Sequence, residues 1–220
     1  PQGAILPVAI YLDATNLWLA DRVRGLIKMS NPYTGEAFAP NGPASNNSYS
    51  LTFSNGILIN TPGGKDGAWN NVFNKDGVSV YSQGMWSLYT RSNTPALDSA
   101  YDILSAAIDP TNSAHMYLGS WGEGLVEIRN GVVTNVYDNT NSILQRRVEY
   151  GWVGIGGLQY DDNGVLWITN SHVPKCLKRL NPDGTWNEYD FSGLLSNGNY
   201  VGPLMITSSG QKWILLPRQG

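Results

Sequence analysis

Charged residues are scarce in this chain of 220 residues: Asp, Glu, Lys and Arg make up 14% of it, and the formal net charge is −3. Ordinary soluble domains carry roughly 25%. Because nucleic-acid binding requires clustered Lys and Arg, we expect no nucleic-acid partner. The single cysteine, Cys176, cannot form an internal disulfide. No apolar run reaches the length of roughly 18 residues that would predict a membrane span.

The residues that are abundant favour β-structure. The chain contains 25 Gly, 12 Pro, 12 Tyr and 8 Trp, a combination of turn-forming residues with aromatic residues that favour strands. The sequence begins at Pro1 and shows neither an initiating Met nor a signal-peptide pattern. We therefore expect it to be part of a longer protein, the rest of which is one of its partners.

Five short apolar segments recur along the chain and resemble one another. Their second residues are separated by 40 to 59 residues, close to the period of roughly 45 residues that β-propeller blades show. Asn-Gly, Asp-Pro or Ser-Gly turns precede four of the five segments, which indicates hairpins. The segments are Leu17–Ala20, Ile57–Asn60, Met116–Gly119, Leu166–Thr169 and Lys212–Leu215.

Two further strands follow each of the first four segments, so each repeat contains four antiparallel strands, as a propeller blade does. The sequence thus predicts an all-β fold, a β-propeller of four-stranded antiparallel blades. About four and a half blades are expected, as a fragment of a larger, seven-bladed propeller. The expected blades span residues 4–45, 46–92, 103–140, 153–192 and, incompletely, 200–220.

The links within the repeats differ in length. Hairpin-length links join strands one and two, and strands three and four, whereas the other links are often longer, as in Pro62–Asp76 and Asp138–Trp152. In an antiparallel blade the longer links emerge on one face, which predicts a binding face there. Unselected drift in loop length is the alternative, because loop closure costs little more as a loop lengthens.

Residues that follow strand two should lie beside the central channel on this long-loop face. Aromatic and charged side chains there suit a sugar or a peptide. The alternative for Trp121 is packing between blades. The candidate ligand-binding residues are Asp21, Arg22, Trp121, Glu123, His172 and Arg218, with Thr61, Pro62, Ser120 and Ser171 at equivalent positions.

No constellation for catalysis or metal binding is found. His172 and Cys176 lack the further ligands of a zinc site, and Asp161–Gly164 lacks the spacing of a calcium loop and is interpreted as a turn. There is no Gly-x-Ser-x-Gly motif, and Glu127 and Glu188 are expected on solvated faces. We therefore expect no enzyme activity, no metal and no cofactor.

Two structural expectations accompany the repeat. Trp18, Trp167 and Trp213 occupy one strand position and are expected in the core between blades. Gly154–Gly157 lacks the helix of a dinucleotide site and is interpreted as the start of an innermost strand, where small residues allow close packing.

The repeats resemble the regulator-propeller repeat of Bacteroidetes envelope proteins, most clearly in Asn163–Asn170 and Gly124–Glu127. They are more similar to the propeller of PorZ-like type IX secretion proteins. That likeness is clearest from Thr90 to Gly220. It is carried by Ala107–Asn112, Tyr117–Leu125, Tyr137–Ser142, Asp183–Trp186 and Gly210–Arg218.

The resemblance implies an exported protein of the periplasm or cell surface that binds a glycan or an envelope protein. A ligand-sensing propeller of a hybrid two-component regulator is the alternative, and a propeller lyase is a third. Asp98-Ser99-Ala100 fits the short O-glycosylation signal that Bacteroidetes use for exported proteins, and it is expected in a long loop.

Overall fold

The structure of the chain is a computed structural model that describes residues 6–38, 41–147, 149–195 and 199–217. It divides into two compact units, Pro1–Gly42 and Pro43–Gly220, each of which is considered by itself. Strands dominate the described residues, and only the short 3₁₀ helix η1 (Pro95–Leu97) interrupts them. No helix in the described part of the chain has the length and apolar character needed to cross a membrane.

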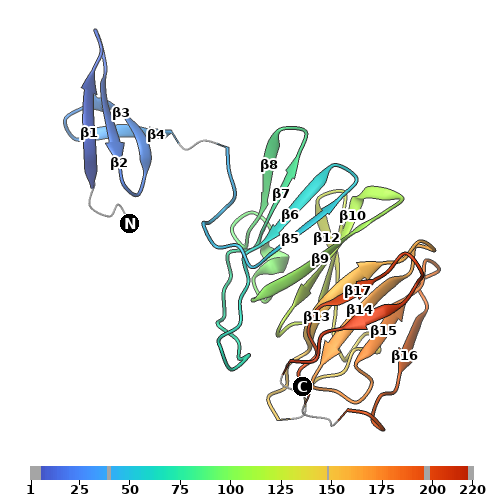
Figure 1. The fold of residues 1–220 in the computed structure, drawn as a ribbon. Coiled ribbons are helices and arrows are strands. Elements are labelled where there is room, and N and C mark those ends of the chain that lie inside the picture. Colours follow the sequence, from blue (N-terminus) through green and yellow to red (C-terminus); the bar gives the residue numbers. More distant parts are fainter. Residues whose placement is uncertain (1–5, 39–40, 148, 196–198, 218–220) are drawn as a thin grey trace. The chain divides into compact units, whose positions relative to one another are not determined.

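The strands form four four-stranded sheets and one two-stranded sheet, all antiparallel (Figure 1). The first unit holds blade 1, with β1 (Pro7–Leu12), β2 (Leu17–Asp21), β3 (Gly25–Asn31) and β4 (Thr34–Phe38). The second unit holds the remaining sheets. Blade 2 is β5 (Ser50–Ser54), β6 (Ile57–Thr61), β7 (Val78–Ser82) and β8 (Met85–Tyr89). Blade 3 is β9 (Ile103–Asp109), β10 (Asn112–Ser120), β11 (Leu125–Arg129) and β12 (Val132–Tyr137). Blade 4 is β13 (Gly154–Tyr160), β14 (Leu166–Ser171), β15 (Leu177–Leu180) and β16 (Trp186–Tyr189). A half-blade follows, with β17 (Leu204–Ile206) and β18 (Lys212–Ile214).

Strand order within every sheet follows chain order, as in an up-and-down propeller blade. The first strands of successive sheets are neighbours in the second unit: β9 lies beside β5 and β13, and β13 lies beside β17. The predicted fold class, a propeller of four-stranded antiparallel blades, is confirmed.

The glycine cluster lies where the sequence predicts, at the start of the inner strand β13. A Cβ atom on Gly156 would lie 2.3 Å from the carbonyl oxygen of Val201, and one on Gly157 would lie 2.6 Å from the Leu204 nitrogen. Glycine is therefore needed for β13 to approach the half-blade this closely.

Local polar contacts explain why the hairpins form where they do. In blade 4 the Asp161 carboxylate accepts hydrogen bonds from the Asn163 and Val165 amides and, at 2.8 Å, from the Trp167 indole. Asp13 and Trp18 repeat this arrangement in blade 1, at 2.9 Å. The turn at Asp161–Gly164 is thus confirmed as a hairpin turn that fixes the following strand.

Blades 2 to 4 bury apolar clusters between their faces. One cluster joins blades 2 and 3 through Ile59, Val78, Leu118 and Ile128, and a second joins blades 3 and 4 through Leu125, Ile155 and Ile168. In blade 1, considered alone, Leu19 and Ile27 are the large apolar side chains that are buried, whereas Val8, Ile10 and Leu12 are exposed.

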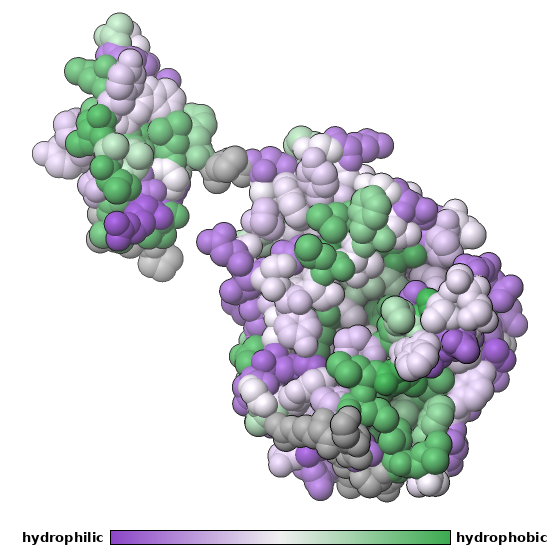
Figure 2. Space-filling model, in the orientation of Figure 1, coloured by the Kyte–Doolittle hydropathy of each residue, from purple (hydrophilic) through white to green (hydrophobic). Residues whose placement is uncertain are grey.

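The core prediction for the three tryptophans is correct for one of them. Trp167 is buried at 6% exposure and packs with Leu177 and Leu204, whereas Trp18 is half-buried. Trp213 is 62% exposed, because no other sheet of the described residues covers this side of β18. Figure 2 shows apolar side chains gathered on the visible face of the second unit. Leu194 in the loop before β17, Met205 on β17 and Leu215 just after β18 are exposed.

Candidate functional site

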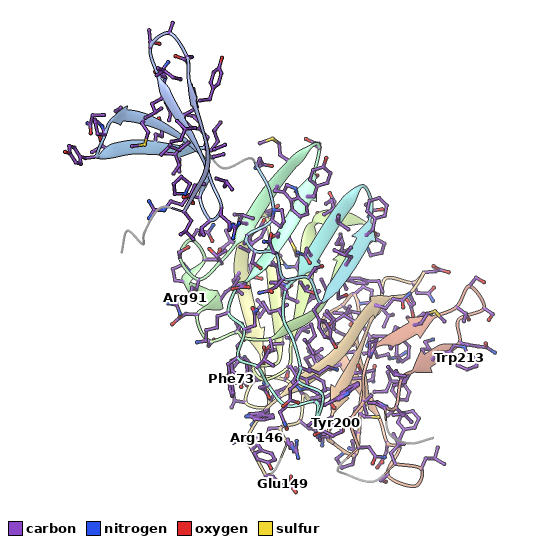
Figure 3. All side chains as sticks on the ribbon, turned by 60° about the vertical axis from the view of Figure 1, so that its left-hand side comes forward. Phe73, Arg91, Arg146, Glu149, Tyr200 and Trp213 are labelled. Atoms are coloured by element: carbon purple, nitrogen blue, oxygen red, sulfur yellow. The ribbon has the colours of Figure 1, made fainter. Side chains whose placement is uncertain are left out.

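The long links of the second unit lie together at one end of its sheets (Figure 1). Hydrogen bonds connect them to the ends of neighbouring strands: Gly63 donates to Ile103 O at 3.1 Å, and His172 donates to Asn199 O at 3.1 Å. The link after β12 joins them, since the Gln145 amide donates to Asn170 Oδ1 at 2.7 Å. In Figure 3, Phe73, Arg146, Glu149 and Tyr200 all lie at this end, whereas Trp213 lies apart.

Four rings from different links meet on this face, and we call them the aromatic cluster: Trp69, Trp121, His172 and Tyr200. The ring centroids of Trp69 lie 6.0 Å from Trp121 and 5.5 Å from Tyr200. Those of His172 lie 6.1 Å from Trp121 and 4.0 Å from Tyr200. All four pairs are edge-to-face, the geometry that favours aromatic contact, so the rings form a closed circuit.

Lys65 places its ammonium against this cluster. Its Nζ lies 3.2 Å from the Trp69 ring centroid and 4.5 Å from that of Trp121, with Tyr49 further off at 5.8 Å. Burial lowers the pKa of Lys65 to about 8. The faces of the rings stabilise the positive charge through the electrons of the indoles, so Lys65 is positioned by cation–π contact.

The hydrogen bonds of His172 indicate which ring nitrogen carries the proton. Ser171 Oγ accepts the Val201 amide at 2.9 Å and lies 3.1 Å from His172 Nδ1. If the serine hydroxyl donates to Nδ1, both groups are satisfied and the proton of the neutral imidazole is on Nε2. Burial, together with Arg147 and Lys65, lowers the pKa of His172 to about 4, which keeps the ring neutral at pH 7.

Two buried polar atoms beside Trp121 lack a hydrogen-bond partner among the described residues. They are His172 Nε2 and Asn71 Oδ1, on side chains that belong to residues only 8% exposed. Asn71 is held through its other atom, since Nδ2 donates to the Trp121 carbonyl at 3.3 Å. An unsatisfied buried polar atom costs about 1–3 kcal/mol. The face therefore retains two polar atoms that the fold does not use: the acceptor Asn71 Oδ1 and His172 Nε2, which is a donor when Ser171 donates to Nδ1.

Backbone strain is concentrated on the same face. Trp69, Phe73, Asp102 and His172 have positive φ angles of 69°, 58°, 48° and 60°, in the left-handed region that residues other than Gly adopt uncommonly, Asp and His more often than Trp and Phe. Such conformations cost roughly 1–3 kcal/mol each and cluster at functional sites. The other positive φ angles of non-glycine residues in the described chain belong to hairpin turns, at Asn55, Gln83 and Asn130.

Asp102 anchors the loop that carries Lys65 and Trp69. Its fully buried carboxylate accepts hydrogen bonds from the amides of Val72, Phe73 and Asn74 at 3.0, 2.9 and 2.8 Å. Its carbonyl accepts the Trp121 amide at 2.9 Å. Burial raises the pKa of Asp102, although these amides oppose the shift. Asp102 thus connects the loop to Trp121.

The structure brings two of the six predicted site residues together, Trp121 and His172. Glu123 is half-buried nearby, where burial and Asp138 raise its pKa and Lys75 opposes them. Trp121 is only 2% exposed, so its role includes packing. Among the equivalent positions, Thr61, Ser120 and Ser171 are buried hydroxyls that hold neighbouring backbone groups.

The other three predicted residues do not join the cluster. Asp21 and Arg22 belong to the first unit, where the Asp21 carboxylate accepts the amides of Leu6, Val23 and Arg24 and so closes its own loop. Arg22 is exposed. Arg218 lies outside the described residues.

Sequence reasoning missed Lys65, Trp69, Asn71, Asp102 and Tyr200. Trp69 had a signal, because it is a tryptophan within the polar loop segment Asp66–Asn70. Asp102 had none, because its three amide partners are defined only once the loop folds around it.

A second polar cluster surrounds Glu127, between blades 3 and 4, and lines a groove of about 1450 Å³. The expected solvated face is wrong for Glu127, which is 1% exposed, because blade 4 covers this side of β11. Its carboxylate accepts hydrogen bonds of 2.6–3.1 Å from His115, Tyr117, Arg129, Asn135 and Tyr137. Burial would raise the pKa of Glu127, but these hydrogen bonds outweigh it and lower the pKa to about 2.

Glu188 is half-exposed and pairs with Lys175 and the fully buried Lys178. Cys176 is buried, and burial raises the pKa of its thiol. Within the described ranges, no group of three or more His, Cys, Asp or Glu side chains is arranged to hold a metal ion.

No family model matches the chain, and no curated protein matches it by sequence. Several solved structures are similar to it. One is PorZ, an essential bacterial surface component of the type-IX secretion system of Porphyromonas gingivalis. The TM-score is 0.73 at 22% identity, and the similarity covers 94% of this chain and 29% of PorZ.

Two further structures are similar at lower scores. The extracellular domain of BT4673 from B. thetaiotaomicron, described as a one-component system, gives a TM-score of 0.52 at 17% identity over 94% of this chain and 25% of that one. YCF48 bound to D1 peptide gives 0.51 at 12% identity over 98% of this chain and 64% of that one. The chain thus spans less than a third of the length of PorZ or BT4673. At these identities the likeness shows the fold, a β-propeller of the kind found in PorZ and in extracellular regulator domains, as the sequence resemblance predicts.

Proposed function

We propose that this chain is a non-catalytic part of an exported, PorZ-like β-propeller that binds a glycan through its long-loop face, with Trp69, Tyr200 and His172 as ligand contacts. The observation that carries the proposal is His172. Its ring is buried among aromatic side chains in a left-handed backbone conformation, and its Nε2 has no partner among the described residues.

Carbohydrate fits the chemistry of this face better than an apolar ligand does. Aromatic rings pack against the C–H faces of sugars, and a sugar hydroxyl both donates and accepts hydrogen bonds. Asn71 Oδ1 is an acceptor without a partner, and His172 Nε2, also without one, is a donor in the tautomer in which Ser171 donates to Nδ1.

The similar proteins support an exported location. PorZ is described as a surface component, and the BT4673 structure is described as an extracellular domain. We infer that this chain is likewise exported, to the periplasm or the cell surface, and that it functions as part of a longer protein.

The test is a screen of the chain against an array of oligosaccharides, followed by titration calorimetry of each one that binds. Trp69→Ala should weaken binding about 10- to 100-fold, because loss of an aromatic anchor typically costs about 2 kcal/mol or more. Trp213→Ala is the matched control, since Trp213 is an exposed tryptophan away from the face. Equal affinities for these two variants would contradict the assignment of the face.

A protein partner and a sensing role are the alternatives within the same fold. YCF48 is described as bound to a peptide, and BT4673 as a one-component system. Pull-down of one specific envelope protein by the wild type, abolished by Trp69→Ala while the glycan array stays negative, would select the protein partner. A ligand-dependent signal from the intact protein in its native cell would select sensing.

A further inference from the structure

This inference rests on the proposed function, in which a ligand contacts His172. Nε2 of His172 is buried in the structure, as is the ring of Trp121 beside it. A ligand oxygen therefore cannot reach Nε2 unless something above it moves. The candidate for that movement is the part of the long loop that carries Lys65 and Trp69, because Trp69 packs on Trp121 and Tyr200, the two rings that contact His172.

Residues 65–71 form a self-contained unit. An isolated antiparallel bridge pairs Lys65 with Asn71 and closes the segment at its base. Within it, Asp66 Oδ1 accepts the amides of Ala68 and Asn70 at 2.8 Å, and the Trp69 amide donates to Asp66 O at 2.9 Å. Asp66, Gly67, Ala68 and Asn70 are exposed. These internal hydrogen bonds would survive if the segment moved as one piece.

Both ends of the segment are fixed to blade 3. Before it, Gly63 donates to Ile103 O, and a Cβ at Gly63 would lie 2.2 Å from that oxygen, so the backbones are in direct contact. After it, the amides of Val72 to Asn74 are held by Asp102. Gly64 separates the first anchor from the segment and provides a pivot, because glycine adopts a wide range of backbone angles.

Besides the edge-to-face packing of Trp69, three contacts hold the segment against Trp121. The Trp121 indole donates to the Trp69 carbonyl at 2.9 Å, Asn71 Nδ2 donates to the Trp121 carbonyl at 3.3 Å, and the Lys65 ammonium rests against the Trp121 ring. Lys65 forms no salt bridge among the described residues, so no carboxylate holds its ammonium group away from Trp121. The strength of this cation–π contact depends on the indole face alone.

We propose that residues 65–71 are a lid over the aromatic cluster, that Lys65 is its latch, and that a ligand oxygen accepts a hydrogen bond from His172 Nε2 only when the lid is open. The lid closes the site between binding events and makes the rate of association depend on its opening. Trp69 then has two roles, as part of the lid and as a ring that packs on the ligand.

The test measures access to His172 without any ligand, by reaction with diethylpyrocarbonate at pH 6 and mass spectrometry. The unprotonated ring nitrogen attacks the reagent and forms an N–ethoxycarbonyl bond, the other ring nitrogen gives up its proton, and ethanol and carbon dioxide are released. The pKa of His172, about 4, keeps its ring neutral and reactive at this pH. Water that enters the open site lets the proton move to Nδ1, so that Nε2 can attack.

His115 is an internal reference, because the chain has only two histidines and both nitrogens of His115 lie 2.9 Å from carboxylate oxygens. We expect His172 in the wild type to react at least tenfold more slowly than a histidine in a short peptide. Lys65→Met, which keeps the side-chain volume and removes the charge, should accelerate the reaction about tenfold, the range of a desolvated cation–π contact. Trp69→Ala should bring the rate close to that of the peptide. His115 should react at the same rate in every variant.

Lys212→Met is the matched control, since Lys212 makes a cation–π contact of 4.3 Å with Trp167 in another part of the unit. The lid is refuted if Lys65→Met reacts no faster than Lys212→Met, or if wild-type His172 reacts as fast as the peptide. Because no ligand is present, this outcome is independent of the glycan test. If Lys65→Met accelerates the reaction of His172 but the glycan array is negative, the proposed function alone is refuted. If the chain binds a glycan but Lys65→Met does not accelerate the reaction, the lid alone is refuted.

Discussion

The two histidines of the chain are both buried, but their surroundings differ in kind. His115, on β10, lies 2.9 Å from Asp109 and 2.9 Å from Glu127, so both its nitrogens have partners. His172, just after β14, has Ser171 as partner for one nitrogen and none for the other among the described residues. The backbone at His172 is left-handed, and that at His115 is not.

The difference separates a cluster that stabilises the fold from the one to which we assign the proposed ligand. Around Glu127 every oxygen is used, which is how a buried charge is accommodated. Around His172 the fold accepts backbone strain and an unused donor, which reduces its own stability. Proteins retain such costs at functional sites, where local rules are broken for a reason outside the fold.

Acid titration should give the largest effect and should separate the two clusters by pH. The pKa of His172 is about 4, below its ordinary value of 6.5, so the unfolded chain binds a proton that the fold excludes as the pH falls from about 6.5 to 4. The pKa of Glu127 is about 2, below its ordinary value of 4.5, so between about pH 4.5 and 2 the unfolded chain again binds a proton that the folded chain does not. Each step should remove about 3 kcal/mol of stability.

Urea unfolding of the full chain, followed by tryptophan fluorescence at intervals from pH 7 to pH 2, measures both steps. His172→Phe should remove the upper step and leave the lower one, and Glu127→Gln should do the reverse. A single step that neither variant alters would show that other carboxylates govern acid unfolding.

Glu127→Gln should also be the costly substitution at pH 7. Glutamine has no charge and only one acceptor oxygen for the five donors that surround Glu127. Loss of one partner from a buried charged network typically costs about 3 kcal/mol or more. Denaturant unfolding at pH 7 measures the loss. The control is Glu149→Gln, whose ion pair with Arg147 is at the surface and is worth at most about 1 kcal/mol. Similar losses for the two variants would contradict the distinction.

The repeat made most of the fold predictable. Strand order, turn positions and the start of β13 follow from periodicity and from turn residues such as Asp161–Gly164, because these are local signals. The predicted exposure of Trp213 and Glu127 was wrong because the neighbouring sheet determines whether a strand residue is covered. The alternation along β11 cannot reveal that both its faces are covered.

The site was predictable only in part for a related reason. Trp121 and His172 follow strand two of their blades, so the repeat places them. Lys65, Trp69 and Tyr200 reach the same place from loops with no repeat, and their meeting depends on hydrogen bonds to Asp102 and on contact with Gly202. Loop length predicted the long-loop face, but it could not predict which side chains meet there.

The smallest effect should come from the histidines themselves, and it tests the comparison most directly. His115→Phe removes one hydrogen bond from the part-buried Asp109 and one from Glu127 Oε1, which keeps Tyr117 and Arg129, so we expect a cost of about 2 kcal/mol at pH 7. His172→Phe keeps the ring contacts with Trp121 and Tyr200 and removes the unpartnered nitrogen, so its cost should be about 0.5 kcal/mol. Denaturant midpoints of the two variants, measured side by side with unchanged m-values, give both numbers. Glycan binding should change in the opposite order, retained by His115→Phe and lost by His172→Phe. A side chain that only supports the fold cannot lower affinity while the folded state stays intact, so loss of binding by a stable His172→Phe variant would assign His172 to the ligand. If one variant loses both stability and binding, the two histidines do not divide these tasks.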